Sequence, residues 1–387
     1  MRTGLRFITF FLGLQFGFAQ VTSAVEKYAL DNTIVSQSSG VIYYNNKIIT
    51  HNDSGGANAL YEMDPTSSVV TRTVTISNAS NVDWEDITQD DNYIYIGDIG
   101  NNYGNRTDLK IYKISKADYD ASNSVSAETI NFSYANQTNF TWNLDTTPWD
   151  AQSLISIDAN NLLIISKNWD TYVAQAYLVP KTPGTFDLSA LSSTLYDTSY
   201  PNDLINGGTY NPLTNKVVLI GYTWNTSTFD VLQPFIYECS GFTGNDVFSG
   251  NNNRYDISSS FPREQTEAID FMDENTYYVT SEYYSETYMG FTASNDGKLI
   301  EVTTSDSALA LNDVDAEAIS LYPNPTAEMV HINMPETAQV EVYNMQAQRL
   351  IHTNRGTVDL TAFRPGMYLF KITTVDKRTL IKKVLKY

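Results

Sequence analysis

The stretch that decides the fold runs from Asn81 to Asn105 and reads NVDWEDITQDDNYIYIGDIGNNYGN. It holds two short apolar segments with strand-like alternation, separated by a polar turn and followed by an acidic loop rich in Gly and Asn. Weaker copies of this plan recur, so that five copies in all are found along the chain. They lie within 41–65, 83–115, 149–181, 205–240 and 265–303.

Each copy continues into a third strand of the type LYEM, IYKI, AYLV, IYEC or LIEV. More variable fourth strands are expected at 69–77, 128–135 and 193–199. Four antiparallel strands, repeated without helices between them, are typical of a β-propeller within an all-β fold.

The number of blades follows from what the copies lack. The fifth copy has no obvious fourth strand, while the segment 25–31 stands unused before the first copy. An N-terminal strand that closes the last blade would use both facts and predicts five blades. Six blades stay open because 241–260 could hold further strands, and a two-sheet sandwich array is the less favoured alternative.

The charge of the chain excludes some partners. The formal net charge is −20, and residues 21–311 contain 13 Lys and Arg against 36 Asp and Glu. Such a surface repels nucleic acid and anionic membranes. It is compatible with the binding of cations, metal ions or neutral glycans, or with a role in solubility alone. Cys239 is the single cysteine, so no internal disulfide is possible and a buried free thiol is expected.

The two ends of the chain differ from the repeats. The first residues read MRTGLRFITFFLGLQFGFAQ and predict a secretory signal peptide over 1–20, cleaved after Ala19 or Gln20. No later segment approaches 18 consecutive apolar residues, so no transmembrane segment is expected. We therefore expect a propeller over 21–304, a linker over 305–317, and a small β-sandwich over 318–387.

The last segment carries a set of motifs in a fixed order. These are LYPNP (321–325), VEVYNMQAQRL (340–350), VDLTAF (358–363), PGMYLFKI (365–372) and LIKKVLKY (380–387). In these motifs the segment resembles the type A sorting domain of the type IX (Por) secretion system of Bacteroidota. The resemblance implies export through the Sec pathway and then across the outer membrane. It makes the type IX machinery a partner and the protein secreted or attached to the cell surface.

The central region also resembles a group of proteins. The pair DWED (83–86) and DIGNN (98–102) is similar to that of uncharacterised secreted bacterial propellers. These are loosely similar to calcium-dependent phosphotriesterase-like and phytase-esterase-like propellers, which carry acidic residues on their innermost strands.

The repeat also predicts where a site lies. In a propeller the first strand of each blade lines the central channel, and the loops before it and after the second strand share one face. This places five residues at the mouth of the channel: Gly40, Glu85, Gln152, Gly208 and Glu267. The ends of the second strands add Asn52, Asp53, Asp98, Lys167, Tyr222 and Glu282.

Several of these side chains are suitable ligands for Ca²⁺, which takes six to eight oxygen atoms. The predicted metal ligands are Glu85, Asp98, Glu267, Glu282 and Asn52. Carboxylates this close repel one another and raise one another's pKa unless a cation is bound. The alternative is that they shape turns or accept backbone N–H groups across blades. Gln152 and Gly208 interrupt the ring of acids.

Aromatic residues near the same face predict a sugar-stacking surface. The predicted ligand-binding residues are Asp53, Trp84, Lys167, Trp169, Tyr222 and Trp224; packing between blades is the alternative role for the rings. His51, in HNDSGG, is a candidate general base. No GxSxG, HExxH, P-loop or dinucleotide fingerprint is present.

Two functions follow from these features, and whether the protein is an enzyme stays open. The first is an exported or cell-surface module that recognises a glycan or a peptide, with or without Ca²⁺. The second is a Ca²⁺-dependent hydrolase of ester or phosphoester bonds. In the second, Glu85 and Glu267 would hold the metal, Asp98 or Glu282 would position water, and His51 would be the base.

Overall fold

The computed structural model describes residues 20–143, 146–225, 230–288, 291–305, 320–333, 339–344, 349–373 and 379–387. The chain divides into two compact units, Phe18–Ser305 and one that contains 306–387. The predicted signal peptide, apart from Gln20, and nearly all of the predicted linker lie outside the described residues. No helix among the described residues is long and apolar enough to cross a membrane.

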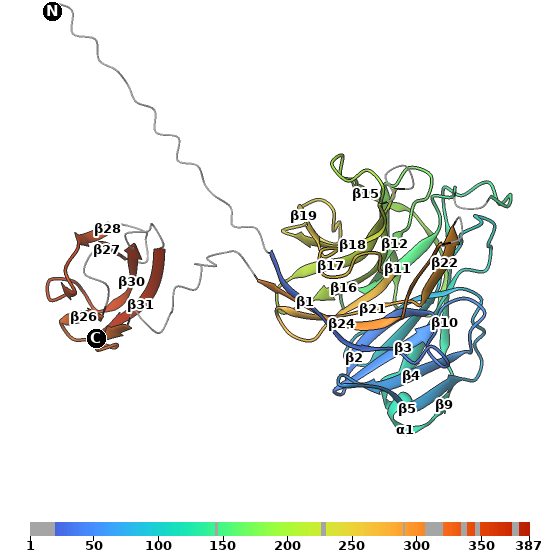
Figure 1. Ribbon diagram of the computed structural model, residues 1–387, viewed down its shortest axis with the longest axis horizontal. Coiled ribbons are helices and arrows are strands. Elements are labelled where there is room, and N and C mark those ends of the chain that lie inside the picture. The colour runs from blue at the N-terminus through green and yellow to red at the C-terminus, as the bar shows by residue number, and fades with distance from the viewer. Residues whose placement is uncertain are drawn as a thin grey trace, which may run out of the picture. The chain divides into compact units, whose positions relative to one another are not determined.

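The described residues of the first unit form five large sheets, each built on four antiparallel strands, and two of these sheets gain a short fifth strand that pairs in parallel (Figure 1). The first strands are β2 (Ser38–Tyr44), β6 (Trp84–Gln89), β11 (Ala151–Ser156), β16 (Asp203–Asn211) and β20 (Thr266–Phe271). The second strands are β3 (Lys47–Asn52), β7 (Tyr93–Asp98), β12 (Asn161–Ser166), β17 (Lys216–Asn225) and β21 (Thr276–Ser281).

The outer strands follow in the same order. The third strands are β4 (Ala59–Asp64), β8 (Lys110–Ser115), β13 (Ala174–Pro180), β18 (Asp230–Ser240) and β24 (Lys298–Ser305). The fourth strands are β5 (Ser67–Ile76), β10 (Glu128–Tyr134), β15 (Ala190–Leu195), β19 (Asn251–Asp256) and β1 (Gln20–Ala29). The segment 241–260, in which extra strands were conceivable, supplies β19 to the sheet of β18.

The first strands lie next to one another in the cyclic order β2, β6, β11, β16, β20 and back to β2. They are almost wholly buried, because the sheets pack against each other on both faces of each strand. Strands buried on both faces can carry apolar residues at successive positions, as Leu154 and Ile155 on β11 and Ala268 and Ile269 on β20 show. This arrangement is of the β-propeller type, and the all-β prediction is confirmed.

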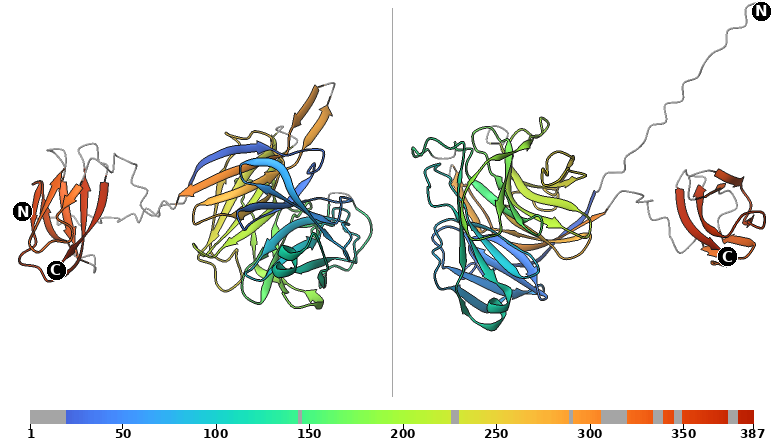
Figure 2. Two further views of the ribbon diagram at one scale, coloured as in Figure 1. Left: turned by 90° about the horizontal axis from the view of Figure 1, so that it is seen from below. Right: turned by 180° about the vertical axis from the view of Figure 1, so that it is seen from behind.

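Small elements fill the gaps between sheets. The two-residue strand β9 (Ser124–Val125) pairs in parallel with β5, and β14 (Gly184–Leu188) pairs in parallel with β10. Each of these short strands therefore joins the chain of one sheet to the outer strand of the preceding sheet. The short helix α1 (Lys116–Ala121) begins at Ser115, whose side chain accepts the N–H of Asp118. The hairpin of β22 (Tyr284–Tyr288) and β23 (Phe291–Asn295) projects from the body of the unit (Figure 2).

Buried carboxylates tie neighbouring first strands together. Asp86 on β6 accepts the N–H of Leu154 on β11 at 2.9 Å. Asp270 on β20 accepts the N–H of Tyr43 on β2 at 2.8 Å and the hydroxyl of Thr209 on β16 at 2.8 Å. Carboxylates therefore connect the sheets by accepting backbone N–H groups, which is the role that the sequence analysis gave as the alternative to metal binding. The carboxylates that do so, Asp86 and Asp270, are not those of the predicted site.

The second unit holds two sheets over one core. One sheet has the order β25 (Ser320–Tyr322), β26 (Met329–Asn333), β29 (Thr357–Asp359). The other has the order β28 (Arg349–Thr353), β27 (Gln339–Tyr343), β30 (Gly366–Thr373), β31 (Thr379–Lys386). Val330, Val342 and Phe370 are fully buried between them, which gives the small β-sandwich that the sequence predicted.

The sheet made by the fifth copy is completed from the other end of the first unit. Strand β1 pairs antiparallel with β24, from Gln20 opposite Ser305 to Ala29 opposite Lys298. The predicted N-terminal strand thus lies where the sequence placed it, although it begins at Gln20 and not at Val25. Cleavage of the signal peptide after Ala19 would leave this strand whole.

Deletion of Gln20–Ala29 should therefore destabilise the first unit. The deletion removes the partly buried Val21 and Ala24 and leaves β24 as an open edge, which costs on the order of 3 kcal/mol or more and favours aggregation. Thermal melts followed by circular dichroism would measure the loss. Deletion of 306–387, a separate compact unit, is the control and should leave this melting temperature unchanged. An unchanged melting temperature without β1 would contradict the pairing.

Candidate functional site

Each of the five sheets has a β-bulge between its first and second strands, always at the same place. The register between first and second strands shifts by one residue near the start of every first strand. A bulge of this kind re-aims a side chain that would otherwise follow the alternation of the strand. The extra residues are Ser39, Glu85, Gln152, Asn206 and Glu267, so every sheet contributes one polar side chain at one end of the ring of first strands.

Four of these side chains, those of Ser39, Glu85, Gln152 and Glu267, line a small cavity of about 180 Å³. The fifth, Asn206, lies behind the wall and donates to the carboxylate of Glu267 at 2.8 Å. The residues after the second strands complete the wall of the cavity together with nearby loop residues. The cavity is lined by Ser39, Asp53, Glu85, Asn102, Gln152, Lys167, Trp169, Tyr222, Gln265, Glu267 and Glu282. The structure therefore brings together eight predicted residues: Asp53, Glu85, Gln152, Lys167, Trp169, Tyr222, Glu267 and Glu282.

Two of the positions predicted on first strands are wrong. In the first sheet the bulged residue is Ser39, while Gly40 pairs with His51. In the fourth sheet the bulged residue is Asn206, while Gly208 pairs with Leu219. A shift of one residue turns a side chain to the other face of a strand, and a bulge cannot be seen in a simple alternation pattern.

At the ends of the second strands, too, a difference of one residue decides which side chain faces the cavity. The residue after the last paired position turns towards the cavity, as Asp53, Lys167 and Glu282 do. In the second sheet this position is Ile99, which is buried among apolar side chains. The preceding Asp98 does not line the cavity and pairs with Arg106 at 2.8 Å.

Asn52 forms hydrogen bonds with backbone groups and does not line the cavity. Its side-chain amide donates to the carbonyl of Ile34 at 2.8 Å and accepts the N–H of Gln37 at 3.2 Å. It holds the loop that precedes the first strand of its own sheet. The structure gives neither Asn52 nor Asp98 the position expected of a metal ligand.

His51, Trp84 and Trp224 lie behind the wall of the cavity. The ring of His51 is fully buried and meets the ring of Trp84 edge-on at 5.6 Å. Burial lowers the pKa of His51 to about 4, so the ring is neutral and has no access to a substrate. Trp84 is fully buried and donates to the carbonyl of Ser80. Trp224 supports Trp169 edge-on at 6.3 Å.

Sequence reasoning missed Asp83 as a site residue. One carboxylate oxygen from each of Asp53, Asp83 and Glu85 lies within 4.8 Å of the others, a spacing that could hold a cation. Asp83 stands two residues before the bulged Glu85, as Gln265 stands two residues before Glu267. This repeated spacing was the available signal, because residues two apart face the same side of a strand.

The DIGNN loop makes room for these acids. A Cβ on Gly100 would overlap the carboxylate oxygens of Glu85 and Asp83. The N–H of Gly100 donates to the carbonyl of Asp83 at 3.2 Å, so the loop backbone lies directly against the carboxylates. Glycine is therefore required here by close approach, which gives the motif a role in shaping the cavity.

One cation faces this group of acids. Lys167 is buried, donates to the side-chain oxygen of Gln152, and donates to the hydroxyl of Tyr222 at 3.0 Å. Burial acts to lower the pKa of Lys167, but Tyr222, Glu267 and Asp150 raise it above the usual value. Lys167 therefore stays charged, and its ammonium lies 5.0 Å from the ring centre of Trp169.

The carboxyl groups of the cavity hold protons more tightly than free ones. Burial raises the pKa of Asp53 to about 6, and burial followed by repulsion from Asp53 and Asp150 raises the pKa of Asp83 to about 7. Burial raises the pKa of Glu267 to about 7, against the opposing effect of Lys167. Burial and neighbouring acids raise the pKa of Glu85 and of Glu282 well above the usual value. Near neutral pH the cavity thus holds both neutral and ionised carboxyl groups.

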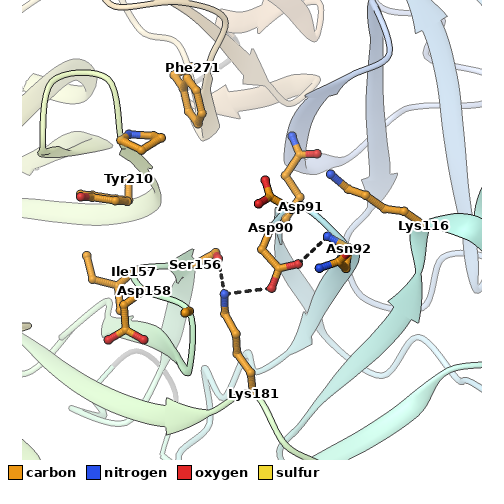
Figure 3. A pocket seen from close by; sticks show the side chains of 13 residues that line it. Asp90, Asp91, Asn92, Lys116, Ser156, Ile157, Asp158, Lys181, Tyr210 and Phe271 are labelled. Atoms are coloured by element: carbon orange, nitrogen blue, oxygen red, sulfur yellow. Dashed lines mark hydrogen bonds and ion pairs between the residues drawn. The ribbon is translucent and has the colours of Figure 1, made fainter.

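A second, wider cavity of about 570 Å³ lies at the other ends of the first strands (Figure 3). Lys181 donates to Asp90 at 2.9 Å and to Ser156 at 2.7 Å, and Asp158 accepts backbone N–H groups of its own turn. Figure 3 shows the rings of Tyr210 and Phe271 across from these charges. Most of its charged groups are already satisfied by the fold.

Comparison with known proteins assigns the end of the chain. Residues 320–387 match the family model of the secretion system C-terminal sorting domain. The match implies that the type IX secretion machinery handles the protein and exports it. A search of curated proteins found no match.

Solved structures resemble the chain only distantly. The GH43 endo-arabinanase of Bacillus licheniformis has 10% identity and a TM-score of 0.42, with 71% of this chain and 96% of that chain covered. The xyloglucan PUL GH43B of Bacteroides ovatus has 8% identity and a TM-score of 0.40, with 94% and 92% covered. The α-L-arabinofuranosidase of Podospora anserina has 9% identity and a TM-score of 0.38, with 73% and 95% covered. Similarities this weak assign no activity to the chain.

The raised pKa of Asp83 predicts an unusual effect of Asp83→Asn on stability. Between the unfolded pKa of 3.8 and the folded pKa of about 7, the native state binds more protons than the unfolded state. The free energy of unfolding therefore falls as the pH rises through this window. In EDTA at pH 8, Asp83→Asn should be more stable than the natural protein by about 1–2 kcal/mol, and the gain should vanish near pH 4.

Asp90→Asn is the matched control for this experiment. The pKa of Asp90 is lowered, because hydrogen bonds from Asn92, Lys181 and Tyr95 outweigh its burial. Its charge therefore stabilises the fold above pH 4, and Asp90→Asn should be less stable than the natural protein at pH 8. Thermal melts from pH 4 to 8 measure both variants. If Asp83→Asn were less stable than the natural protein at pH 8, the repulsion among these buried carboxylates would be contradicted.

Proposed function

We propose that residues 20–305 form a five-bladed β-propeller, exported through the type IX pathway, that binds one saccharide unit of an extracellular glycan in the acidic cavity. The observation that carries this proposal is the matching bulge in all five sheets. Four of the bulges place a polar side chain in the wall of one cavity and the fifth places Asn206 against Glu267, and packing alone does not require that. The cyclic order of the first strands and the closure by β1 support five blades.

The lining of the cavity suits the hydroxyl groups of a sugar. Gln152, Gln265 and Asn102 offer amides that donate and accept, and Tyr222 offers a phenol. Carboxyl groups with a pKa near 7 add further donors and acceptors at neutral pH. The volume is below the roughly 300–1,000 Å³ of sites for larger ligands, so it accepts one small unit.

The charge of the cavity bears on the choice between a glycan and a peptide. A basic side chain of a peptide would be attracted by the excess of acids. It would also meet Lys167, which occupies the wall beside Gln152 and Tyr222 and repels a second cation. The mixture of amides, neutral carboxyls and the indole of Trp169 favours a neutral polyhydroxyl ligand.

One observation favours a second function, a Ca²⁺-dependent hydrolase. Asp53, Asp83 and Glu85 would be the protein ligands of the ion, since their oxygens lie within 4.8 Å of one another. A bound Ca²⁺ would polarise an ester or phosphoryl oxygen. Glu267 and Glu282 would remain beside Lys167 and Gln265, outside this group. No histidine lines the cavity among the described residues, so the base of the sequence hypothesis is missing. Binding is therefore the favoured function.

Binding of neutral oligosaccharides tests the first function. The natural protein should bind members of an array of neutral plant and microbial oligosaccharides, and Glu282→Gln should lower the affinity about tenfold because it replaces a carboxyl group, which can accept hydrogen bonds at both oxygens, with an amide that accepts at only one. Asp91→Asn, in the second cavity, is the control and should bind as the natural protein does. Binding only to Lys- or Arg-containing peptides on a parallel peptide array would contradict glycan binding and identify the ligand as a peptide. Binding to neither array would contradict a recognition role.

A thermal melt with Ca²⁺ tests the second function. A ligand that binds only the folded state raises the melting temperature by mass action. If the metal binds, Ca²⁺ added after EDTA treatment should raise the melting temperature by several degrees, and Asp83→Asn should abolish the rise. Glu267→Gln should leave it in place, because Glu267 lies outside the three-carboxylate group. No rise at millimolar Ca²⁺ would exclude a calcium site.

A further inference from the structure

Exposed aromatic side chains of the first unit gather on one side. Among its described residues the large exposed aromatic side chains are Tyr103, Phe140, Trp142, Tyr196, Tyr200 and Tyr283. All six lie in loops that precede a first strand or follow a second strand, at the end of the ring of first strands where the acidic cavity lies. Two of them, Tyr103 and Tyr283, directly follow residues that line the cavity, Asn102 and Glu282. Exposed apolar groups that cluster beside a cavity mark a binding surface more often than scattered ones do.

Two of these rings form a flat platform. Tyr103 and Trp142 stack with their centres 5.2 Å apart and their planes 19° apart. Trp142 is 59% exposed, whereas each of the other four tryptophans is buried or partly buried. An indole left this exposed gains little from its own fold, because it keeps most of its apolar surface in water.

Backbone and side-chain hydrogen bonds between two loops fix the platform. The N–H of Asn143 donates to the carbonyl of Tyr103 at 2.9 Å, and the side chain of Gln137 donates to the carbonyl of Gly104 at 2.9 Å. The loop that carries Trp142 and the loop that carries Tyr103 are therefore held together on both sides of the stacked pair. A pre-formed surface binds with a smaller loss of entropy than a loose one.

The platform is continuous with the cavity. Asn102, which precedes Tyr103, lines the cavity, and consecutive Cα atoms lie about 3.8 Å apart. On the other loop, the carbonyl of Thr147 accepts the N–H of Trp169, which also lines the cavity. Both halves of the platform are thus joined to the cavity wall through a few residues.

We propose that Tyr103 and Trp142 form a subsite that stacks against a sugar ring of the same glycan whose other unit occupies the cavity. The inference rests on the proposed glycan-binding function and narrows it to chains of two or more sugars. The apolar face of a sugar ring lies flat against aromatic rings, while its hydroxyl edge stays in water. The cavity supplies hydrogen bonds to one unit, and the platform supplies contact area to a neighbouring unit.

The test compares ligand length in three proteins. The probes are neutral glucose, xylose, arabinose and mannose oligosaccharides of one to six units, measured by isothermal titration. The natural protein should bind chains more tightly than single sugars. Trp142→Ala should weaken the binding of chains about tenfold and leave that of single sugars unchanged. Leu213→Ala, which removes an equally exposed apolar side chain from the turn between β16 and β17, is the control and should change neither.

Fluorescence gives a second readout that does not depend on affinity. Iodide in water should quench mainly Trp142, the exposed tryptophan, and a bound chain should protect it while a single sugar does not. Trp142→Phe keeps a flat ring and should retain much of the affinity for chains. Equal affinity of the natural protein and Trp142→Ala for chains would overturn the subsite alone. If the natural protein bound none of these probes, neither single sugars nor chains, both the subsite and the proposed function would be overturned.

Discussion

One extra residue in each pair of first and second strands is the constraint on which the site depends. A regular strand would point alternate side chains into the packing between sheets, and a polar side chain there would need a buried partner. The bulge releases one residue per sheet from this alternation and turns it to the end of the ring of first strands. Because the sheets repeat around a ring, four of these residues, far apart in sequence, meet in one small cavity, and the fifth, Asn206, hydrogen-bonds one of them. The same repetition brings the loops with exposed aromatic rings to the same end of the ring of first strands.

The cavity concentrates charges that the fold alone does not need. Elsewhere in the first unit buried acids are satisfied, as Asp86 and Asp270 are by backbone N–H groups of neighbouring strands. In the cavity, Glu282 accepts from the amide of Gln265, and Glu85 accepts weakly from the hydroxyl of Ser39 at 3.3 Å. Lys167 compensates a part of this charge, and proton uptake compensates more of it. Such an arrangement costs stability, which is the expected trade where a binding site is built into a packed fold.

The sequence predicted the repeat, the N-terminal strand at the open edge of the last sheet, the β-sandwich at the C-terminus and eight of the residues that line the cavity. It missed what depends on the exact register of the strands. Gly40 for Ser39 and Asp98 for Ile99 are errors of one residue, and Gly208 for Asn206 is an error of two, because a bulge leaves no mark in the hydrophobic pattern. The burial of His51 against Trp84 and under Gly40 depends on contacts between sheets, which no local pattern contains. Trp142 lies in a loop outside the repeated plan, so only the structure relates it to the cavity.

The convergence of distant residues is tested most directly by a double-mutant cycle at pH 8 in EDTA. Asp53 and Glu282 are 229 positions apart in the chain and follow second strands of neighbouring sheets, and the charge of Asp53 raises the pKa of Glu282. The free energy of unfolding would be measured for Asp53→Asn, Glu282→Gln and the double variant. If the two carboxyls share the cavity, relief of repulsion by one change reduces the relief left for the other. The double variant should then be less stable than the sum of the single changes by at least about 0.5 kcal/mol. Additive changes, within about 0.3 kcal/mol, would contradict the account.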